Sequence, residues 1–215
     1  MTLEVMLREL TIGFGQTFLI FILVLLFSLP FGMVVYFGRN CKFKPISWLV
    51  KIYISIMRGT PLMLQLIVWY FGPYYLFGMQ IGGYKFTAIM LGCVFNYAAY
   101  FAEIYRSGIE SIPKGQYEAA QILGYTKVQT FMKIILPQVV KIVLPSVTNE
   151  VITLVKDTSL VYSVSYIEMF AVAKQIAAKE TTVMPLVIAG VYYYIFNAVV
   201  AWIMERFEKK LSYYR

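Results

Sequence analysis

The chain has 215 residues, of which 60% are hydrophobic and only 14% are charged. A soluble domain carries roughly 25% charged residues. This composition, with a mean hydropathy of +0.70, therefore excludes an ordinary globular surface and predicts an all-α integral membrane protein. The net charge of +8 does not indicate nucleic-acid binding. The basic residues fall in short segments between apolar runs, which is the pattern that orients membrane proteins.

Five apolar stretches follow one another along the chain, each long enough for the roughly 20 residues that a helix needs to cross a bilayer. We expect these spans at residues 11–38, 60–77, 86–105, 138–163 and 181–204, in a single membrane domain that covers residues 1–215. Residues 46–57 are predicted to form an interfacial helix that leads into the second span, and residues 166–180 a partly helical polar connector. The turn after the second span is expected to be bracketed by Gly72-Pro73 and Gly82-Gly83.

The connectors between these spans differ in charge, and this difference predicts the orientation of the chain. Segments 39–58 and 106–141 and the C-terminal tail, which includes Arg215, hold most of the basic residues. The other side holds only Arg8, Lys85, Lys174 and Lys179. Basic connectors stay in the cytoplasm, so we expect a multi-pass protein with its N-terminus outside and its C-terminus in the cytoplasm.

Residues 114–137 form a polar, charged island on the predicted cytoplasmic side. Residues 117–123 are long enough for about two helical turns, and Gly124 suits the left-handed residue that ends such a helix. Thr126 and Gln129 fit a capping box that starts a second helix, and Pro137 is expected to stop or bend it. The expected apolar face of this second helix consists of Val128, Phe131, Met132 and Ile135.

This island is predicted to be a compact helix–turn–helix that docks a partner, because Ala119 and Ala120 are small enough to allow close approach. An amphipathic loop that only links two spans fits the same periodicity. The details of the sequence favour docking. Three parts of the island carry distinctive residues: Glu118-Ala119-Ala120, Gly124 and Ile135-Leu136-Pro137. In this order they resemble the EAA motif of binding-protein-dependent ABC importer permeases.

Three further stretches resemble the polar-amino-acid branch of that family. They are Arg58-Gly59-Thr60-Pro61-Leu62, the segment AYFAEIYRSGI at residues 99–109, and Lys156-Asp157-Thr158-Ser159-Leu160. The four motifs occur in order between residues 58 and 160, and together with the five expected spans the resemblance takes in nearly the whole chain. The residues that it implies in coupling to an ATPase are Glu118, Ala119, Ala120, Gly124, Leu136 and Pro137.

The resemblance implies a type I ABC importer permease in the inner membrane of a bacterial cell, with a coupling loop at about residues 107–137. The implied partners are two copies of a cytoplasmic ABC ATPase, a second permease subunit (a homodimer rather than a heterodimer), an external solute-binding protein and an amino-acid substrate. The chain has no G-x-x-x-x-G-K-[ST] loop, so ATP and its Mg²⁺ are expected on the ATPase. No cofactor and no enzymatic activity are expected on this chain.

A stripe of polar residues runs along the predicted fourth span. Ser146, Glu150, Thr153 and Asp157 step by four, three and four residues, which places them on one helix face. A charge at membrane depth costs about 2.5–3.5 kcal/mol and normally faces a cavity or a partner. The stripe therefore predicts a cavity for a cation, which favours a basic amino acid such as arginine, lysine or histidine. The full set of predicted pathway residues is Glu150, Asp157, Asn149, Thr153, Ser146 and Asn96.

Structural roles are also open for these charges. Lys156 is placed to pair with Asp157 or Glu150 and so hold helices together, and Asn96 is placed to pack against a neighbouring helix. Glu103 and Arg106 have the spacing of an i,i+3 pair. Arg58 is expected to be an interfacial anchor, with a gate as the alternative.

Two other classes of function compete with an ABC permease. A secondary transporter driven by an ion gradient shares the intramembrane carboxylates, but such proteins usually contain internal repeats, and none is found in these five spans. An enzyme is disfavoured, because the chain has no histidine. Its two cysteines, Cys41 and Cys93, lie in different segments and are expected to form no disulfide.

Overall fold

The computed structural model describes residues 1–80 and 82–211, and within these residues every regular element is a helix. Four helical stretches are long and apolar enough to cross a membrane, and a bent pair of shorter helices makes a fifth when it is counted as one span. This confirms the helical membrane fold, although α1 begins well before the predicted start of the first span. The long helices are α1 (Leu3–Arg39), α4 (Lys85–Glu110), α7 (Leu136–Asp157) and α9 (Met184–Leu211).

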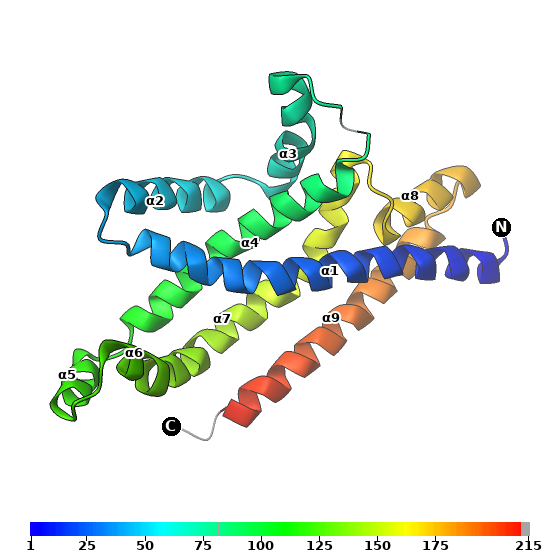
Figure 1. Ribbon diagram of the computed structural model, residues 1–215. Helices are drawn as coiled ribbons and strands as arrows, with labels where there is room; N and C mark the ends of the chain where they lie inside the picture. Colours follow the sequence, from blue (N-terminus) through cyan, green and yellow to red (C-terminus); the bar gives the residue numbers. More distant parts are fainter. Residues whose placement is uncertain (81, 212–215) are drawn as a thin grey trace.

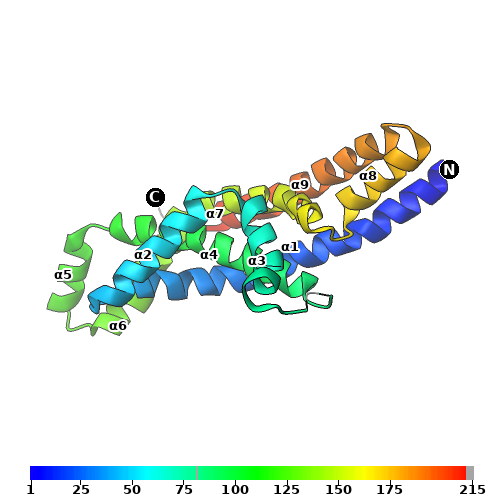
Figure 2. The ribbon, with the colours of Figure 1, turned by 90° about the horizontal axis from the view of Figure 1, so that it is seen from above.

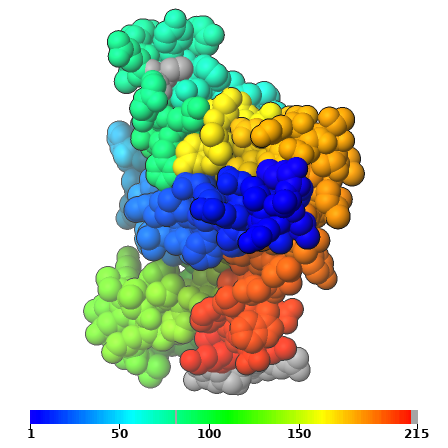
Figure 3. All heavy atoms as spheres, turned by 90° about the vertical axis from the view of Figure 1, so that its right-hand side faces the viewer, coloured from blue at the N-terminus to red at the C-terminus, as the bar shows by residue number. Residues whose placement is uncertain are grey.

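The molecule is elongated, with different elements at its two ends. Helices α5 (Lys114–Ile122) and α6 (Lys127–Thr130) lie at one end, and the N-terminus and α8 (Met169–Glu180) lie at the other (Figure 1, Figure 2). Between the ends, α4, α7 and α9 run obliquely in a similar direction and α1 packs across α4 (Figure 1). In the ribbon views, the α5–α6 region projects as a lobe beyond the start of α7, and in the space-filling view it forms a lower corner of the molecule (Figure 1, Figure 3).

The core forms where α1, α4 and α7 meet. Ile20 of α1, Phe101 of α4 and Val155 of α7 are completely buried there. In a bilayer, close packing rather than the hydrophobic effect drives helices together, and small residues allow it. A Cβ atom at Gly108 of α4 would overlap the Cγ1 atom of Val143 in α7, so glycine is required at this crossing.

The predicted interfacial helix and the predicted second span correspond to α2 (Lys44–Gly59) and α3 (Leu62–Phe77), whose axes are bent by 114°. The bend occurs because Thr60 is extended, as the residue before a proline prefers. The Nε2 atom of Gln65 donates to the carbonyl oxygens of Met57 and Thr60 at 3.0 and 3.1 Å, which satisfies backbone acceptors left free by the break.

The predicted start of the turn after α3 was wrong. Gly72 and Pro73 lie inside α3, which ends at Gly78 in the left-handed conformation with φ of 65°. The amide nitrogens of Gly78 and Met79 donate to carbonyl oxygens of the last helical turn and close it. Proline is tolerated inside a membrane helix when neighbouring groups satisfy the freed backbone, so Pro73 did not end this one.

The prediction that Pro137 stops or bends its helix was also wrong in part. Helix α6, the π-helical turn η1 (Phe131–Ile135), α7 and the 3-10 helix η2 (Thr158–Val164) form one uninterrupted helical stretch. Pro137 lies in the first turn of α7, directly after the π-helical turn. The missing N–H group of Pro137 falls just after the π-helical turn, where the helical hydrogen-bond pattern changes, and the helix does not end there. The chain therefore continues from the α5–α6 region into the fourth span without a loop.

A buried acid joins three helices at the end opposite to α5. Glu168 is 0% exposed and caps the N-terminus of α8, where its carboxylate accepts from the amide nitrogens of Phe170 and Ala171, both at 2.8 Å. The hydroxyls of Thr17 in α1 and Tyr193 in α9 also donate to it, at 3.2 and 3.0 Å. Burial raises the pKa of the Glu168 carboxyl, and these hydrogen bonds oppose that shift. The predicted polar connector thus contains a residue that ties α1, α8 and α9 together.

Candidate functional site

Two adjoining cavities lie along the polar face of α7. The first has a volume of about 340 Å³, and Ser146 and Glu150 contribute to its wall. The second also has about 340 Å³ and is lined by Glu150, Thr153 and Asp157. Because Glu150 and Tyr100 line both, the cavities are neighbours. The four residues of the polar stripe therefore face cavities, as their spacing predicted; their role in transport stays a prediction.

The other predicted pathway residues have different surroundings. Asn96 is buried in the wall of the second cavity, where its side-chain amide donates to Met57 O at 3.0 Å and to Gln65 Oε1 at 2.9 Å. It therefore packs against a neighbouring element, as the alternative interpretation had it. Asn149 is exposed on the adjacent side of α7. The Oδ2 atom of Asp157 accepts a hydrogen bond from the Tyr97 hydroxyl at 2.8 Å.

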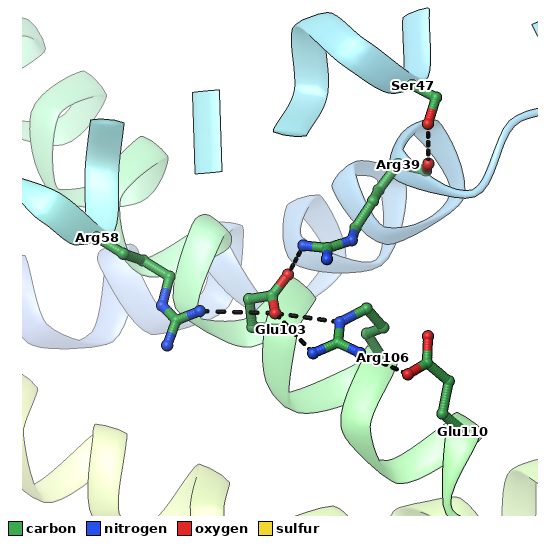
Figure 4. A network of polar contacts seen from close by, with 6 residues as sticks. All are labelled: Arg39, Ser47, Arg58, Glu103, Arg106 and Glu110. Carbon is green, nitrogen blue, oxygen red and sulfur yellow. Dashed lines mark hydrogen bonds and ion pairs between the residues drawn. The ribbon is translucent and has the colours of Figure 1, made fainter. Parts of the chain in front are cut away.

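A charged network lies at the opposite end of the first cavity, around Glu103 (Figure 4). The Nε and Nη2 atoms of Arg106 donate to Glu103 Oε2 at 3.1 and 3.0 Å. Arg39, at the end of α1, contacts Oε1, and Arg58 Nη1 of α2 lies 3.6 Å from Oε2. Arg106 also donates to Glu110. Three guanidinium groups from three helices thus share two carboxylates.

The sign of the charge changes along the connected cavities. A third cavity of about 480 Å³ shares Arg58 and Glu103 with the first, and its wall also carries Arg39 and Lys51. The cavity that contains Asp157 has carboxylates and no basic residue among its lining side chains. The lining of these three cavities is therefore acidic at the end near Asp157 and basic at the end near Arg39. The first cavity, between them, is lined by side chains of both charges.

The α5–α6 region confirms the predicted helix–turn–helix. Gly124 has φ of 78°, and the amide nitrogen of Tyr125 donates to Ala120 O at 3.0 Å, which closes α5 in a Schellman-type turn. The capping box is present: Gln129 N donates to Thr126 Oγ1 at 3.2 Å, and Thr126 N donates to Gln129 Oε1 at 2.9 Å. The turn between the helices is therefore held by its own backbone.

The four residues of the predicted apolar face of the second helix differ in burial. Ile135 is buried and Phe131 partly buried, but Val128 and Met132 are exposed. Helix α6 has only four residues before the π-helical turn, which changes the helical phase. Ile122 and Leu123, at the end of α5, are 87% and 73% exposed. The lobe thus presents a large apolar surface, which is typical of an interaction site.

The predicted coupling residues lie in two places. Glu118 and Ala119 are on the exposed side of α5, and Ala120 is buried beneath them. Gly124 forms the turn, while Leu136 and Pro137 begin α7. One continuous helical stretch therefore connects the α5–α6 lobe with Glu150 and the cavities.

Sequence reasoning missed most of the Glu103 network and the whole Glu168 site. It predicted the pair of Glu103 with Arg106 but treated Arg58 as an interfacial anchor, whereas Arg58 lines two cavities. The sequence did contain a signal for the Glu103 network, because the distribution of basic residues put Arg39, Arg58 and Arg106 on the same predicted side of the membrane. Cys41 and Cys93 are both free, as predicted. Among the described residues, histidine, cysteine, aspartate and glutamate form no group of three suited to a metal ion.

Spans that surround polar cavities, with the exposed α5–α6 lobe at one end, define a membrane permease with the fold of a type I ABC importer subunit. Residues 28–213 match the family of binding-protein-dependent transport system inner membrane components. The chain belongs to this family.

Known members with similar sequences cover most of the chain. The arginine transport system permease protein ArtQ of Bacillus subtilis is 36% identical over 201 residues, which are 93% of this chain and 91% of ArtQ. The putative glutamine transport system permease protein GlnP of Rickettsia bellii is 35% identical over 195 residues, 88% of this chain and 87% of GlnP. A crystal structure of an amino acid ABC transporter with histidines matches with a TM-score of 0.86 and 29% identity, over 94% of both chains.

Proposed function

We propose that this chain is the membrane-spanning subunit of an ATP-driven ABC importer for polar amino acids. The observation that carries the proposal is the unbroken helical path from the exposed α5–α6 lobe to the cavity wall at Glu150. A force applied to the lobe would act directly on that wall. The similarity to ArtQ and GlnP supports amino acids as the substrate class.

The α5–α6 lobe would bind a cytoplasmic ATPase. Exposed Glu118 and Ala119 offer a polar and a small contact, Ala120 packs beneath them, and Gly124 fixes the turn. Leu136 and Pro137 lie where the movement enters α7. ATP and Mg²⁺ would bind to the ATPase, and this chain would supply no catalytic residue. Two ATPases, a second copy of this chain and an external solute-binding protein would complete the importer.

The cavities along α7 would form the path of the substrate through the membrane. Glu150 lies where two of them meet, so a cationic group moving between them must pass its carboxylate. Ser146, Thr153 and Asp157 would supply further polar contacts, with Asn96 held in the wall and Asn149 on the flank. This acidic face favours a basic amino acid. The distribution of basic residues supports a cytoplasmic lobe and an external N-terminus.

Uptake of amino acids into vesicles that contain the complete complex is expected to require ATP and the ATPase subunit. The chain lacks a phosphate-binding loop of its own, so an ATPase that cannot hydrolyse ATP should reduce uptake to background. The measurement is radiolabelled amino-acid accumulation with and without ATP. Uptake driven by a proton or sodium gradient alone would instead support a secondary transporter.

Glu150→Gln is expected to reduce transport of a cationic amino acid about tenfold, because it removes one charged partner of the substrate. A neutral amino acid should be affected much less. The measurement compares initial uptake of arginine with that of glutamine in the same vesicles. Glu205→Gln, the same change at an exposed position of α9, is the matched control. Equal losses for both substrates would remove Glu150 from recognition.

A further inference from the structure

Arg58 has an unusual position for a charged residue. It lies in the last turn of α2, just before the 114° bend that separates α2 from α3. Its guanidinium carbon is 5.4 Å from the centre of the Tyr100 ring, and its side chain, 43% exposed, lines the cavities on both sides of Glu103. A charge inside a membrane domain normally faces a cavity or an ionic partner.

The ionic partner of Arg58 is already occupied by other groups. Arg106 donates twice to Glu103 Oε2, and Arg39 contacts Oε1. Arg58 Nη1 is left 3.6 Å from Oε2, beyond hydrogen-bonding distance. A guanidinium carries five donors in a fork that matches a carboxylate. Of the three arginines around Glu103, Arg58 therefore has the weakest hold on it and the most donors to offer a ligand.

The first cavity presents a carboxylate across from this guanidinium. Glu150 on α7 and Arg58 on α2 line the same space of about 340 Å³, a volume within the range of small-molecule sites. The neighbouring space beyond Glu150 is acidic, and the one beyond Arg58 is basic. A ligand with both charges is therefore oriented by this field. Its carboxylate points toward Arg58, and in a basic amino acid the cationic side chain points toward Glu150.

We propose that Arg58 binds the α-carboxylate of the transported amino acid, so that the permease itself distinguishes amino acids from the corresponding amines. This inference rests on the proposed function and adds the chemical group that the substrate must carry. A bound carboxylate accepts a bidentate pair of hydrogen bonds from the guanidinium. Arg58 then leaves Glu103, which keeps Arg39 and Arg106. Substrate occupancy is thereby linked to the contact between α2 and α4.

The test is a binding measurement on the purified complex of the permease with its ATPase in lipid nanodiscs. A panel of the twenty amino acids first identifies those that bind, by calorimetry. Each ligand is then compared with its decarboxylated amine, for example L-arginine with agmatine, and with its carboxamide, which lacks the negative charge. In the unmodified protein we expect the amino acid to bind at least about tenfold more tightly than either analogue.

Arg58→Gln is expected to weaken binding of the amino acid about tenfold and to leave binding of the amine unchanged, which also shows that the cavity is intact. Arg58→Lys keeps the charge but loses the forked pair of donors, so its affinity for the amino acid should lie between those of the unmodified protein and Arg58→Gln. Arg206→Gln, at an exposed position of α9, is the control. Equal binding of amino acid and amine by the unmodified protein overturns the proposal, and this result does not depend on any variant folding.

The same experiment separates this inference from the proposed function. Discrimination that persists in Arg58→Gln overturns the role of Arg58 alone, because amino-acid binding is then still present. A complex that binds none of the twenty amino acids overturns the proposed substrate class together with this inference. Discrimination that is lost in Arg58→Gln and kept in Arg206→Gln supports both.

Discussion

Glu168→Ala is expected to lower the stability of the protein by about 2–5 kcal/mol. The change removes the N-cap of α8, which is worth about 0.5–2 kcal/mol. It also leaves the Tyr193 hydroxyl without its acceptor, at a cost of about 1–3 kcal/mol, whereas the Thr17 hydroxyl can still donate to Gly13 O. Because the site joins α1, α8 and α9, its loss loosens three elements together.

Thermal unfolding of the detergent-solubilised protein, followed by intrinsic fluorescence, measures this effect. Glu168→Gln should cost less, because its carbonyl oxygen can still accept from Ala171 N, and the hydroxyls of Thr17 and Tyr193 can turn to accept from its amide group. Glu180→Gln, at the exposed end of the same helix, is the control and should melt close to the unmodified protein. If Glu168→Ala melted at the same temperature as this control, the buried carboxylate would have no structural role.

The long helices were predictable because bilayer-length apolar runs leave few alternatives for the backbone. Helices α1, α4, α7 and α9 correspond to four of the five predicted spans. Their ends were less predictable, because a helix continues past the apolar run wherever its backbone bonds are still satisfied. The first span was expected from residue 11, yet α1 begins at Leu3, in a segment that contains Glu4, Arg8 and Glu9.

Proline rules taken from soluble helices failed at two positions. Pro73 lies within α3, and Pro137 follows a π-helical turn that keeps α6 and α7 continuous. At both positions the missing N–H group did not end the helix, which the proline rule had implied. The glycine at position 124 was predictable, because its left-handed turn depends on local geometry alone.

The candidate site was predictable only where one helix carries it. Ser146, Glu150, Thr153 and Asp157 follow from helical periodicity on α7. The Glu103 network brings together α1, α2 and α4, and Glu168 combines α1, α8 and α9. Contacts between distant segments depend on how helices pack, which periodicity does not encode. Arg215, which was expected on the cytoplasmic side, falls outside the described residues.

Gly124→Val is expected to reduce ATP-driven uptake at least about tenfold, while the membrane-spanning helices stay folded. Glycine at this position has φ of 78°, a conformation that costs an L-residue about 1–2 kcal/mol and a β-branched one more. A Cβ atom added at this position meets nothing within 4 Å, so the strain acts on the backbone of the turn. The α5–α6 lobe would then lose the arrangement that presents Glu118 and Leu123 to a partner.

The measurement combines three readouts on the same preparation: co-purification of the ATPase subunit, ATP-driven uptake and melting temperature. Gly115→Ala is the matched control, because it lies in the same lobe, also meets nothing within 4 Å, and has no positive φ to strain. It should retain uptake. Glu118→Lys tests the docking surface separately, since it reverses one exposed charge without changing the turn.

The combination of results decides between docking and simple linkage. Loss of ATPase binding in Gly124→Val and in Glu118→Lys, with melting unchanged, would make the lobe the docking element. Loss in Gly124→Val with retention in Glu118→Lys would mean that the shape of the turn matters and the charge does not. If both variants bound the ATPase and transported normally, the α5–α6 lobe would be only a connection between α4 and α7, and the coupling role would be wrong.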